Sequence, residues 1–577
     1  MHSKRNYSNL INAGMIAVSI LCAAFLFWKC RYGIADCDEA FYLTIPQRLL
    51  QGDALFYDEW NISQMYAFIL YPLFHLFKRL HSDPAGILLA FRIIYVLVQI
   101  VSGAFIFFFL KRYSKFGAFL AALTFALYAP FNIMALSYNS ICFSTLTVSL
   151  ILMLRSPESS HPAILMIVSG LLFALSVVCQ PYLAVLYAVY TILILVLLLP
   201  VFSRSHWIKR PPFLPLAIRS WCFFTVGVLI VFLIFLLFVT RKHSLMSLFS
   251  CLPDVLYEPE HYKEDLLHRV WSYIIDVRYS SPWYLFILPS YIGLFILNLF
   301  FLRKKNVSRF IFLFASAVTV LFLLSFALNK PYVNFYMFPL NILTLFALLQ
   351  LPDAINLRLF IHLWLPGMFY SFFTSCTSNQ SFYASSSASI VALMGSILIL
   401  IRTSGVIWSV SRIISKLCVA VPTITVTLFM ICLESYTRYS DVYWQPSISS
   451  QTEKIGFGCE KGLIVSSDSL NMYTETYLDS QEILTTFPNA TSILNYTLEQ
   501  WFYLDVPDLH IGSFSAWFPS VGEETVSRLI HYYEIDGHTM PDLIYLKRES
   551  LDTCLFFCKE FGYHQHMLSS GNIVLSR

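Results

Sequence analysis

Residues 36–77 read DCDEAFYLTIPQRLLQGDALFYDEWNISQMYAFILYPLFHLF and directly follow the first apolar segment of the chain. The stretch opens with acidic residues, continues as an amphipathic helical pattern to Gly52, and then reaches a second acidic pair and an aromatic-rich run. Carboxylates beside a bilayer are costly unless they are solvated, paired or used. Two interpretations are open: a solvated loop that its charges keep out of the lipid, or a carboxylate site that meets the head group of a lipid-borne substrate. The carboxylates are Asp36, Asp38, Glu39, Asp53, Asp58 and Glu59.

The composition of the whole chain excludes a soluble globular protein. Of 577 residues, 57% are hydrophobic and only 12% are charged, and the mean hydropathy is +0.66. Uncharged apolar runs of about 20 residues are typical of membrane-spanning helices. The net charge of +4 does not indicate a nucleic-acid partner, because the Lys and Arg residues form short clusters between apolar segments. The 13 cysteines are scattered and include no CxxC pair of the zinc-binding type.

The apolar runs predict a bundle of about thirteen transmembrane helices over residues 1–435. The first run, residues 10–28, follows Lys4 and Arg5 and lacks a small-residue cleavage site, so we interpret it as an anchor and not as a signal peptide. The expected spans are 10–28, 86–110, 116–135, 139–154, 162–179, 182–202, 221–240, 283–302, 310–328, 335–351, 359–375, 382–401 and 417–434.

The distribution of basic residues predicts which side of the membrane each connection faces. With the N-terminus in the cytoplasm, every cytoplasmic connection carries Lys or Arg, whereas the opposite turns near Tyr138, Gln180 and Asn379 carry none. This is the positive-inside pattern. It predicts that the loops at 29–80 and 241–282 and the C-terminal region are extracytoplasmic. The basic connections are residues 111–115, 155, 204–219, 303–309, 358 and 402–416.

Residues 436–577 differ in composition from the bundle and predict a small α/β domain. Charged and turn-forming residues return, and strand-like runs such as GLIVSS, PDLHIGSF, PDLIYLKR and GNIVLSR flank a helical pattern, GEETVSRLIHYYE. Cys459, Cys554 and Cys558 fall in this region. In an oxidising compartment two of them can pair, but the spacing of Cys554 and Cys558 suits one helix face and makes a poor bridge, and free buried thiols explain them equally well.

The organisation of the first loop resembles a known family. One spanning helix, an outer loop that opens with Asp-Glu, an aromatic residue, an amphipathic helix, a glycine and a further Asp resemble the membrane glycosyltransferases of the GT-C fold. The protein O-mannosyltransferases and the aminoarabinose transferases that modify lipid A are the most similar branches, and the latter also share the expected span count and outer C-terminal domain. The Tyr/Pro-rich segment 330–339, KPYVNFYMFP, is similar to one found late in their bundle. The matching residues are Asp38, Glu39, Tyr42, Leu50, Gly52, Asp58 and Arg92.

The resemblance implies transfer of a hexosyl or pentosyl group from a polyprenyl phosphate to an acceptor, with inversion at the anomeric carbon. No nucleotide is needed, and the sequence has no P-loop or dinucleotide-binding glycine motif. Such a reaction needs a carboxylate that accepts the proton of the acceptor. Asp38 is the candidate base, and Glu39 is its expected catalytic partner. The alternative for Asp38 is a structural role as the cap of a helix that begins near Phe41.

The departing phosphate needs cations or hydrogen-bond donors. Arg92 lies near the outer end of an apolar helix, where an Arg is expensive unless it meets an anion, although it can also reach the interface by snorkelling. Lys330 is a second candidate, with Tyr332 and Tyr336 as donors or as residues of the aromatic belt.

A divalent metal ion and the acceptor remain open at this stage. Asp58 and Glu59 are candidates for the vicinity of either, together with Glu39. His261, Glu264 and His268 fall at i, i+3 and i+7, which suits a metal site and ordinary amphipathic packing equally. The chain also departs from the mannosyltransferase pattern: residues 60–65 read WNISQM where that family has a Pro-Pro motif, and the second outer turn offers Asn139 in place of a carboxylate.

The sequence therefore predicts a polytopic GT-C-type glycosyltransferase of the cell envelope, by default in a bacterial cell membrane. Its expected partners are the lipid bilayer, a polyprenyl-phosphate-linked sugar and an unidentified acceptor, with no nucleic acid. A transporter or flippase of lipid-linked saccharides is the main alternative, but transporters show internal repeats and broken helices with midplane charges, whereas here the carboxylates gather in one outer loop. A non-catalytic assembly partner is a further alternative.

Overall fold

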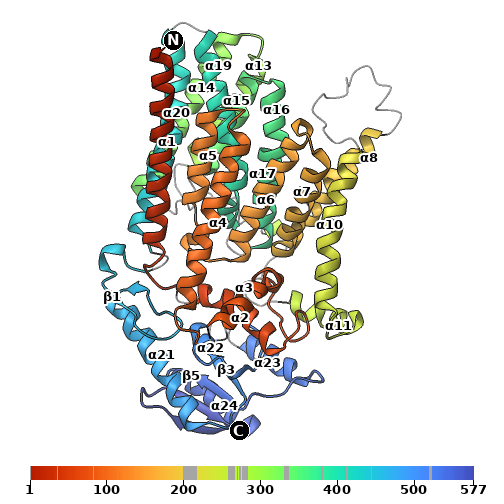
Figure 1. Ribbon diagram of the computed structural model, residues 1–577, viewed down its shortest axis with the longest axis vertical. Helices are drawn as coiled ribbons and strands as arrows, with labels where there is room; N and C mark the ends of the chain where they lie inside the picture. Colours follow the sequence, from red (N-terminus) through yellow and green to blue (C-terminus); the bar gives the residue numbers. More distant parts are fainter. Residues whose placement is uncertain are drawn as a thin grey trace.

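The computed structural model shows a long helical bundle with a small α/β unit at one end (Figure 1). It describes residues 2–35, 37–81, 83–198, 218–257, 284–329, 337–378, 381–410, 413–442, 445–516, 518 and 523–577, together with residues 267, 268, 271 and 275.

Helices lie at each of the expected spans, but the count of thirteen spans is not confirmed. Among the described residues, eight helices are long and apolar enough to cross a membrane, and several others are shorter. One example is α5, which ends at Leu127 and not near residue 135, because the chain turns at Pro130. The helices of the bundle are α1 (His2–Lys29), α4 (Ile87–Leu110), α5 (Lys115–Leu127), α6 (Tyr138–Arg155), α7 (Pro162–Cys179), α8 (Ala184–Leu198), α10 (Ile218–Val239), α13 (Tyr284–Phe300), α14 (Lys305–Asn329), α15 (Met337–Gln350), α16 (Ala354–Leu359), α17 (Leu365–Thr377), α18 (Ser381–Ala388), α19 (Ile390–Val410) and α20 (Ile413–Ser440).

Local sequence signals and small residues fix these helices in place. Ser137 caps α6 in a reciprocal hydrogen-bonded box with Ser140. Helices α7 and α10 pack backbone to backbone at Gly170 and Gly227, where an added Cβ would lie 2.0 Å from the Phe224 carbonyl oxygen and 2.1 Å from that of Ile167. Such close approach at small residues is how helices associate in a lipid environment.

The first loop folds as a layer between the bundle and the C-terminal unit, at the end of the bundle opposite the N-terminus (Figure 1). It contains α2 (Asp38–Gln51), a short turn η1 (Gln64–Tyr66) and α3 (Ala67–Leu80). Helix α11 (Leu245–Leu256), from the loop after α10, lies at the same end. The expected amphipathic helix is present as α2, but residues 39–49 are buried all round because both neighbours cover it.

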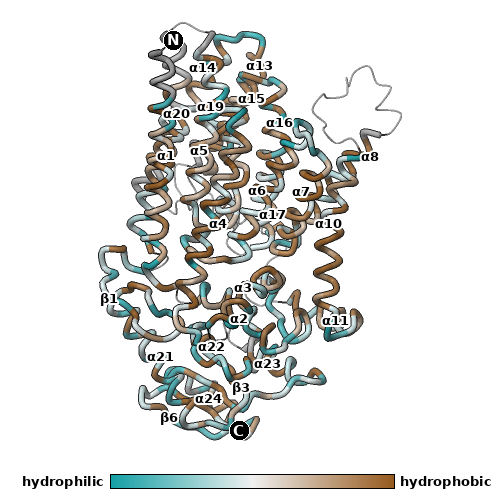
Figure 2. Tube along the Cα trace, viewed as in Figure 1, coloured by the Kyte–Doolittle hydropathy of each residue, from teal (hydrophilic) through white to brown (hydrophobic). Residues whose placement is uncertain are grey.

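The C-terminal region is an α/β unit, as expected, and more hydrophilic than the bundle (Figure 2). Its main sheet has the order β4-β3-β5-β7-β6, with β3 parallel to β4 and β5, and β7 antiparallel to β5 and β6. Helix α20 extends to Ser440, so the change from bundle to α/β unit falls a few residues beyond position 436. The elements are β1 (Glu453–Lys454), β2 (Ile464–Val465), α21 (Ser467–Thr486), β3 (Ser492–Tyr496), α22 (Trp501–Asp505), β4 (His510–Ile511), α23 (Glu523–Glu534), β5 (Leu543–Leu546), α24 (Leu551–Phe561), β6 (His564–Met567) and β7 (Ile573–Ser576).

The three cysteines of this unit are free thiols in the structure. Cys459 is buried beside Asp505, whereas Cys554 and Cys558 lie one turn apart on α24.

Candidate active site

Asp38 is the first residue of α2 and is half-buried. The N-cap position is taken by Cys37, whose side chain makes no capping hydrogen bond, so the expectation that Asp38 caps a helix starting near Phe41 is wrong. A carboxylate in the first turn is stabilised by the free N–H groups and the positive end of the helix dipole. Asp38 therefore lies in the first turn of α2, where the helix dipole favours its negative charge.

Glu39 and Arg92 form a buried, bidentate ion pair that joins α2 to α4. The Arg92 Nε donates to Glu39 Oε1 at 2.5 Å, and Nη2 donates to Oε2. The Nη1 atom donates to the carbonyl oxygens of Cys30 and Tyr32, each at 3.1 Å, beyond the end of α1. A guanidinium has five N–H donors, so one remains beyond these four contacts. The pair fixes the start of α2 against the ends of two spanning helices.

A small cavity lies beside this ion pair and carries further cations that the sequence analysis did not single out. Lys29, Arg92 and Asn132 line it, together with Glu39. Lys29 is buried and donates to the Asp441 carbonyl oxygen. Arg438 donates to Asn132 Oδ1 and, at 2.8 Å, to the Ala129 carbonyl oxygen. Two basic side chains, Lys29 and Arg92, therefore line the cavity with Glu39, and Arg438 contacts its wall at Asn132.

Asn132 adds a strained backbone to the same cavity. Its φ of 63° lies in the left-handed region, which non-glycine residues seldom occupy. Such conformations persist where the surrounding structure holds them, here through the contact with Arg438.

The face of α2 that carries Tyr42 contacts the start of α6. Tyr42 lies one turn after Asp38 and therefore on the same helix face. Its ring is 6.0 Å from that of Tyr138 and 5.9 Å from that of Tyr66. Asn139, next to Tyr138, accepts a hydrogen bond from Gln180 Nε2 at 3.0 Å. The side of α2 that bears Asp38 thus faces an aromatic and amide surface of the bundle.

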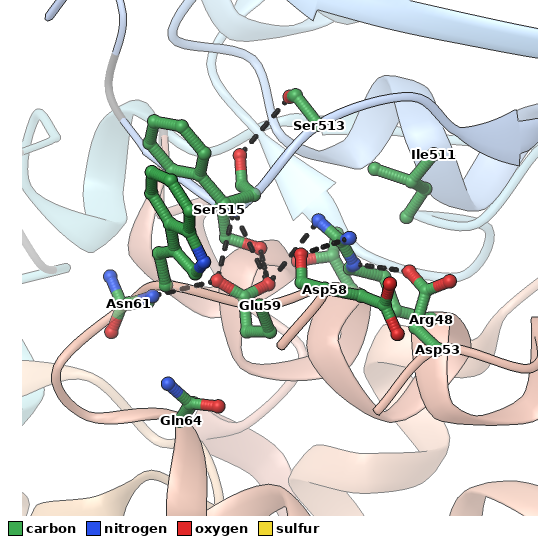
Figure 3. Close-up of polar contacts among 12 residues, drawn as sticks. Arg48, Asp53, Asp58, Glu59, Asn61, Gln64, Ile511, Ser513 and Ser515 are labelled. Atoms are coloured by element: carbon green, nitrogen blue, oxygen red, sulfur yellow. Dashed lines mark hydrogen bonds and ion pairs between the residues drawn. The ribbon is translucent and has the colours of Figure 1, made fainter. Parts of the chain in front are cut away.

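Two other carboxylates of the first loop, Asp53 and Glu59, pair with Arg48 of the same loop and also bind the C-terminal unit (Figure 3). Arg48 is fully buried, with Nε 2.7 Å from Asp53 Oδ2 and Nη1 3.4 Å from Glu59 Oε2. Glu59 also accepts from the Ser515 hydroxyl at 2.7 Å and from the Ser515 N–H. Burial alone would lower the pKa of Arg48, but Asp53 and Glu59 outweigh it and hold that pKa above its usual range.

Asp53 and Asp58 extend this network to two histidines. Asp53 Oδ1 is 2.8 Å from His510 Nε2, and Asp58 Oδ1 is 3.2 Å from His538 Nε2. Burial alone would raise the pKa of Asp53, but Arg48 and His510 more than offset it, so the pKa is lowered. Asp58 and Glu59, expected near the acceptor or a metal, are thus placed in the interface with the C-terminal unit, apart from Asn139.

The loop after α10 joins the same interface. Arg528 donates to the carbonyl oxygens of Trp60, at 2.9 Å, and Asp254, at 2.7 Å. Its guanidinium lies 4.5 Å from the centre of the Phe514 ring. One side chain of the C-terminal unit therefore holds both loops that were expected outside the membrane.

Several of the expected site residues lie outside the described residues, namely Lys330, Tyr332, Tyr336, His261 and Glu264. His268 is described and is exposed. Within the part of the chain that the structure describes, no three His, Cys, Asp or Glu side chains form a group that could hold a metal ion. The expectation of a divalent metal stays a prediction.

No family model and no curated protein sequence matches the chain. Among solved structures, ArnT from Cupriavidus metallidurans bound to undecaprenyl phosphate is similar over 98% of this chain and 97% of its own, with 11% identity and a TM-score of 0.43. The apo state of that protein gives 10% identity and a TM-score of 0.41 over 99% and 98% of the two chains.

The archaeal oligosaccharyltransferase AglB from Archaeoglobus fulgidus, in complex with an inhibitory peptide and a dolichol-phosphate, is similar over 97% of this chain and 74% of its own. The identity is 11% and the TM-score is 0.45.

Proposed function

We propose that this protein is an integral-membrane glycosyltransferase that moves a sugar from a polyprenyl phosphate to an acceptor on the extracytoplasmic face. The observation that carries the proposal is the half-buried Asp38 at the end of an apolar bundle, beside a cavity lined by Lys29 and Arg92. A base and nearby cationic side chains at the membrane boundary are what transfer from a lipid phosphate requires. The resemblance of the first loop to GT-C enzymes supports the same assignment.

Asp38 is the proposed base. The oxygen of the acceptor hydroxyl attacks the anomeric carbon, the bond from that carbon to the phosphate oxygen breaks, and the hydroxyl proton passes to the Asp38 carboxylate. Attack opposite the leaving group inverts the anomeric centre, and a single carboxylate suffices for one displacement. The products are the glycosylated acceptor and free polyprenyl phosphate.

Glu39 has a positioning role in this scheme, because both of its oxygens accept hydrogen bonds from Arg92. A carboxylate whose two oxygens both bind a guanidinium is held in a fixed orientation. It supports Asp38 by fixing the first turn of α2 against the spanning helices.

The leaving phosphate is assigned to the vicinity of Arg92, next to the cavity, because the cavity itself has a volume of only about 20 Å³. Arg92 offers its remaining N–H, and Lys29 and Arg438 add positive charge around it. Charge-assisted hydrogen bonds to a phosphate are stronger than neutral ones, especially where water is excluded. Lys330, Tyr332 and Tyr336 remain proposed donors to the same phosphate.

The acceptor is assigned to the side of α2 that faces Tyr138 and Asn139, because Asp38 and Tyr42 share that face. Aromatic rings and amides are suitable groups for binding a sugar or a polar acceptor. A divalent ion, if one takes part, would find carboxylates in the same loop, and the steps above do not depend on it.

The test separates an enzyme from a transporter. The purified protein is reconstituted with polyprenyl-phosphate-linked hexoses and pentoses and no nucleotide sugar, with cell-envelope extract as the source of acceptor. We expect consumption of one donor and an equal amount of free polyprenyl phosphate. If the donor stays intact and only moves from one leaflet of the membrane to the other, the protein is a flippase and the proposal is excluded.

A further inference from the structure

A large groove lies between α1, α4 and α5, in the half of the bundle remote from Asp38. It has a volume of about 900 Å³, and its lining includes Met15, Ile16, Ala104, Phe108 and Leu123. That volume is at the upper end of the range of about 300–1,000 Å³ in which proteins bind small ligands. The lining is mostly apolar, and all three helices belong to the membrane bundle.

Small residues in the lining leave the space of the groove unfilled. Gly103 and Ala122 bring α4 and α5 together so closely that an added Cβ on Gly103 would lie 3.0 Å from the Ala122 carbonyl oxygen. Ala23, Ala104 and Ala126 add little side-chain volume to the walls. Helix α1 stands along the outside of the groove, next to α4 and α5 (Figure 1).

Two lysines lie at one end of the groove. Lys111 follows the last residue of α4, and Lys115 begins α5. Lys115 donates to Asn12 Oδ1 of α1, and the Lys111 ammonium lies 4.8 Å from the centre of the Phe108 ring. Among the described residues, neither lysine forms an ion pair with a carboxylate.

The neighbouring arginines differ in this respect. Arg112, Arg155 and Arg358 all pair with Glu158. Glu158, the carboxylate in these ion pairs, is thus already shared by three cations. The end of the groove therefore keeps a net positive charge that suits an anionic head group.

We propose that this groove binds one anionic glycerophospholipid, with its phosphate at Lys111 and Lys115 and its acyl chains along α1, α4 and α5. Basic pockets between membrane helices on the cytoplasmic side are suited to anionic head groups. The positive-inside pattern places this end in the cytoplasm.

The groove is distinct from the proposed donor site. Arg92 on α4 and Lys111, the residue after its end, are 19 residues apart, which is about 28 Å along a helix and close to the thickness of the hydrocarbon core. A donor whose phosphate reaches Arg92 cannot place that phosphate at Lys111. The lipid of the groove therefore has its head group in the opposite leaflet.

The test measures lipid bound to the purified full-length protein by native mass spectrometry, during titration with phosphatidylglycerol or phosphatidylcholine. We expect one phosphatidylglycerol to bind preferentially. The K111Q/K115Q variant should weaken its binding by about 30-fold, as expected for loss of two charges near a lipid phosphate. Ala104→Trp should fill the groove and also reduce binding.

Matched controls distinguish this site from general effects. The K304Q/K305Q variant removes two exposed lysines from another connection, and Val101→Trp adds the same bulk to an exposed position of α4 outside the groove. Both should bind phosphatidylglycerol as the wild type does.

Equal binding of phosphatidylcholine, or equal losses in variants and controls, would overturn the inference. So would displacement of phosphatidylglycerol by undecaprenyl phosphate, which would identify a polyprenyl site instead. Because the readout is bound lipid and not sugar transfer, it is independent of the proposed activity.

Discussion

Replacement of Arg48 by Met should loosen the part of the first loop that packs against the C-terminal unit, because Arg48 holds the two carboxylates that contact His510 and Ser515. The substitution keeps an apolar side chain of similar length but removes the cation that Asp53 and Glu59 share. Both carboxylates are buried, with side chains 7% and 1% exposed, so water cannot replace the lost partner.

The free-energy cost of this substitution depends on the burial of the two carboxylates. Breaking a buried ion pair by removing one partner costs about 3–5 kcal/mol. Ser515, Asn61 and His510 still bind the two carboxylates, which favours the lower end of that range. The open population of the interface should then rise roughly 10²-fold or more.

Limited proteolysis of the detergent-solubilised protein measures that population, because cleavage tracks the open fraction when opening and closing are fast. The signal is cutting within residues 46–61, which the interface covers, identified by mass spectrometry. The matched control is Arg548→Met, which removes an exposed partner of Glu549 and should cost at most about 1 kcal/mol.

A rescue variant makes the reasoning refutable. In R48M/D53N/E59Q no buried charge is left without its partner, so most of the protection should return. If R48M is cut no faster than R548M, or if the triple variant is cut as fast as R48M, the buried charges do not hold this interface.

Three further predictions concern other parts of the molecule. Arg92→Met should cost sugar transfer more than Glu39→Gln, because Arg92 serves both the fixation of α2 and the proposed phosphate site; kcat of the two variants, each shown to be folded, compares them. Burial raises the pKa of Asp505 to about 7 despite hydrogen bonds from Cys459 and Tyr473. Since the folded state holds this proton more tightly than the unfolded state, stability should fall as pH rises from about 4 to 7, and Asp505→Asn should flatten that slope in thermal melts. Gly227→Leu should separate α7 from α10 and lower the melting temperature, whereas the same change at Gly14, where an added Cβ meets nothing within 4 Å, should not.

Hydropathy and turn signals predicted much of the fold. The runs GLIVSS, PDLHIGSF, PDLIYLKR and GNIVLSR each contain an observed strand, because alternating apolar residues between turn formers have few other ways to be buried. The α/β fold of the C-terminal region is confirmed. The expected span at 116–135 was too long. A hydrophobic run does not by itself show that the chain turns at Pro130.

The candidate site was less readable from the sequence. Which carboxylate meets His510 or Ser515 depends on contacts between residues more than 450 positions apart, and no local pattern encodes them. Lys29 and Arg438, by contrast, could have been found. Each is a cation at the end of an apolar helix, the same signal that singled out Arg92.

The central claim is that Asp38 removes the proton of the acceptor, and one measurement tests it most directly. Asp38→Asn and Asp83→Asn are compared in release of polyprenyl phosphate from the donor, because Asp83 is an exposed carboxylate at the same end of the bundle. General-base catalysis contributes about 10²–10⁴-fold, so Asp38→Asn should lose at least the lower value in kcat, while Asp83→Asn keeps the wild-type rate. A folded Asp38→Asn variant with full activity would contradict the account.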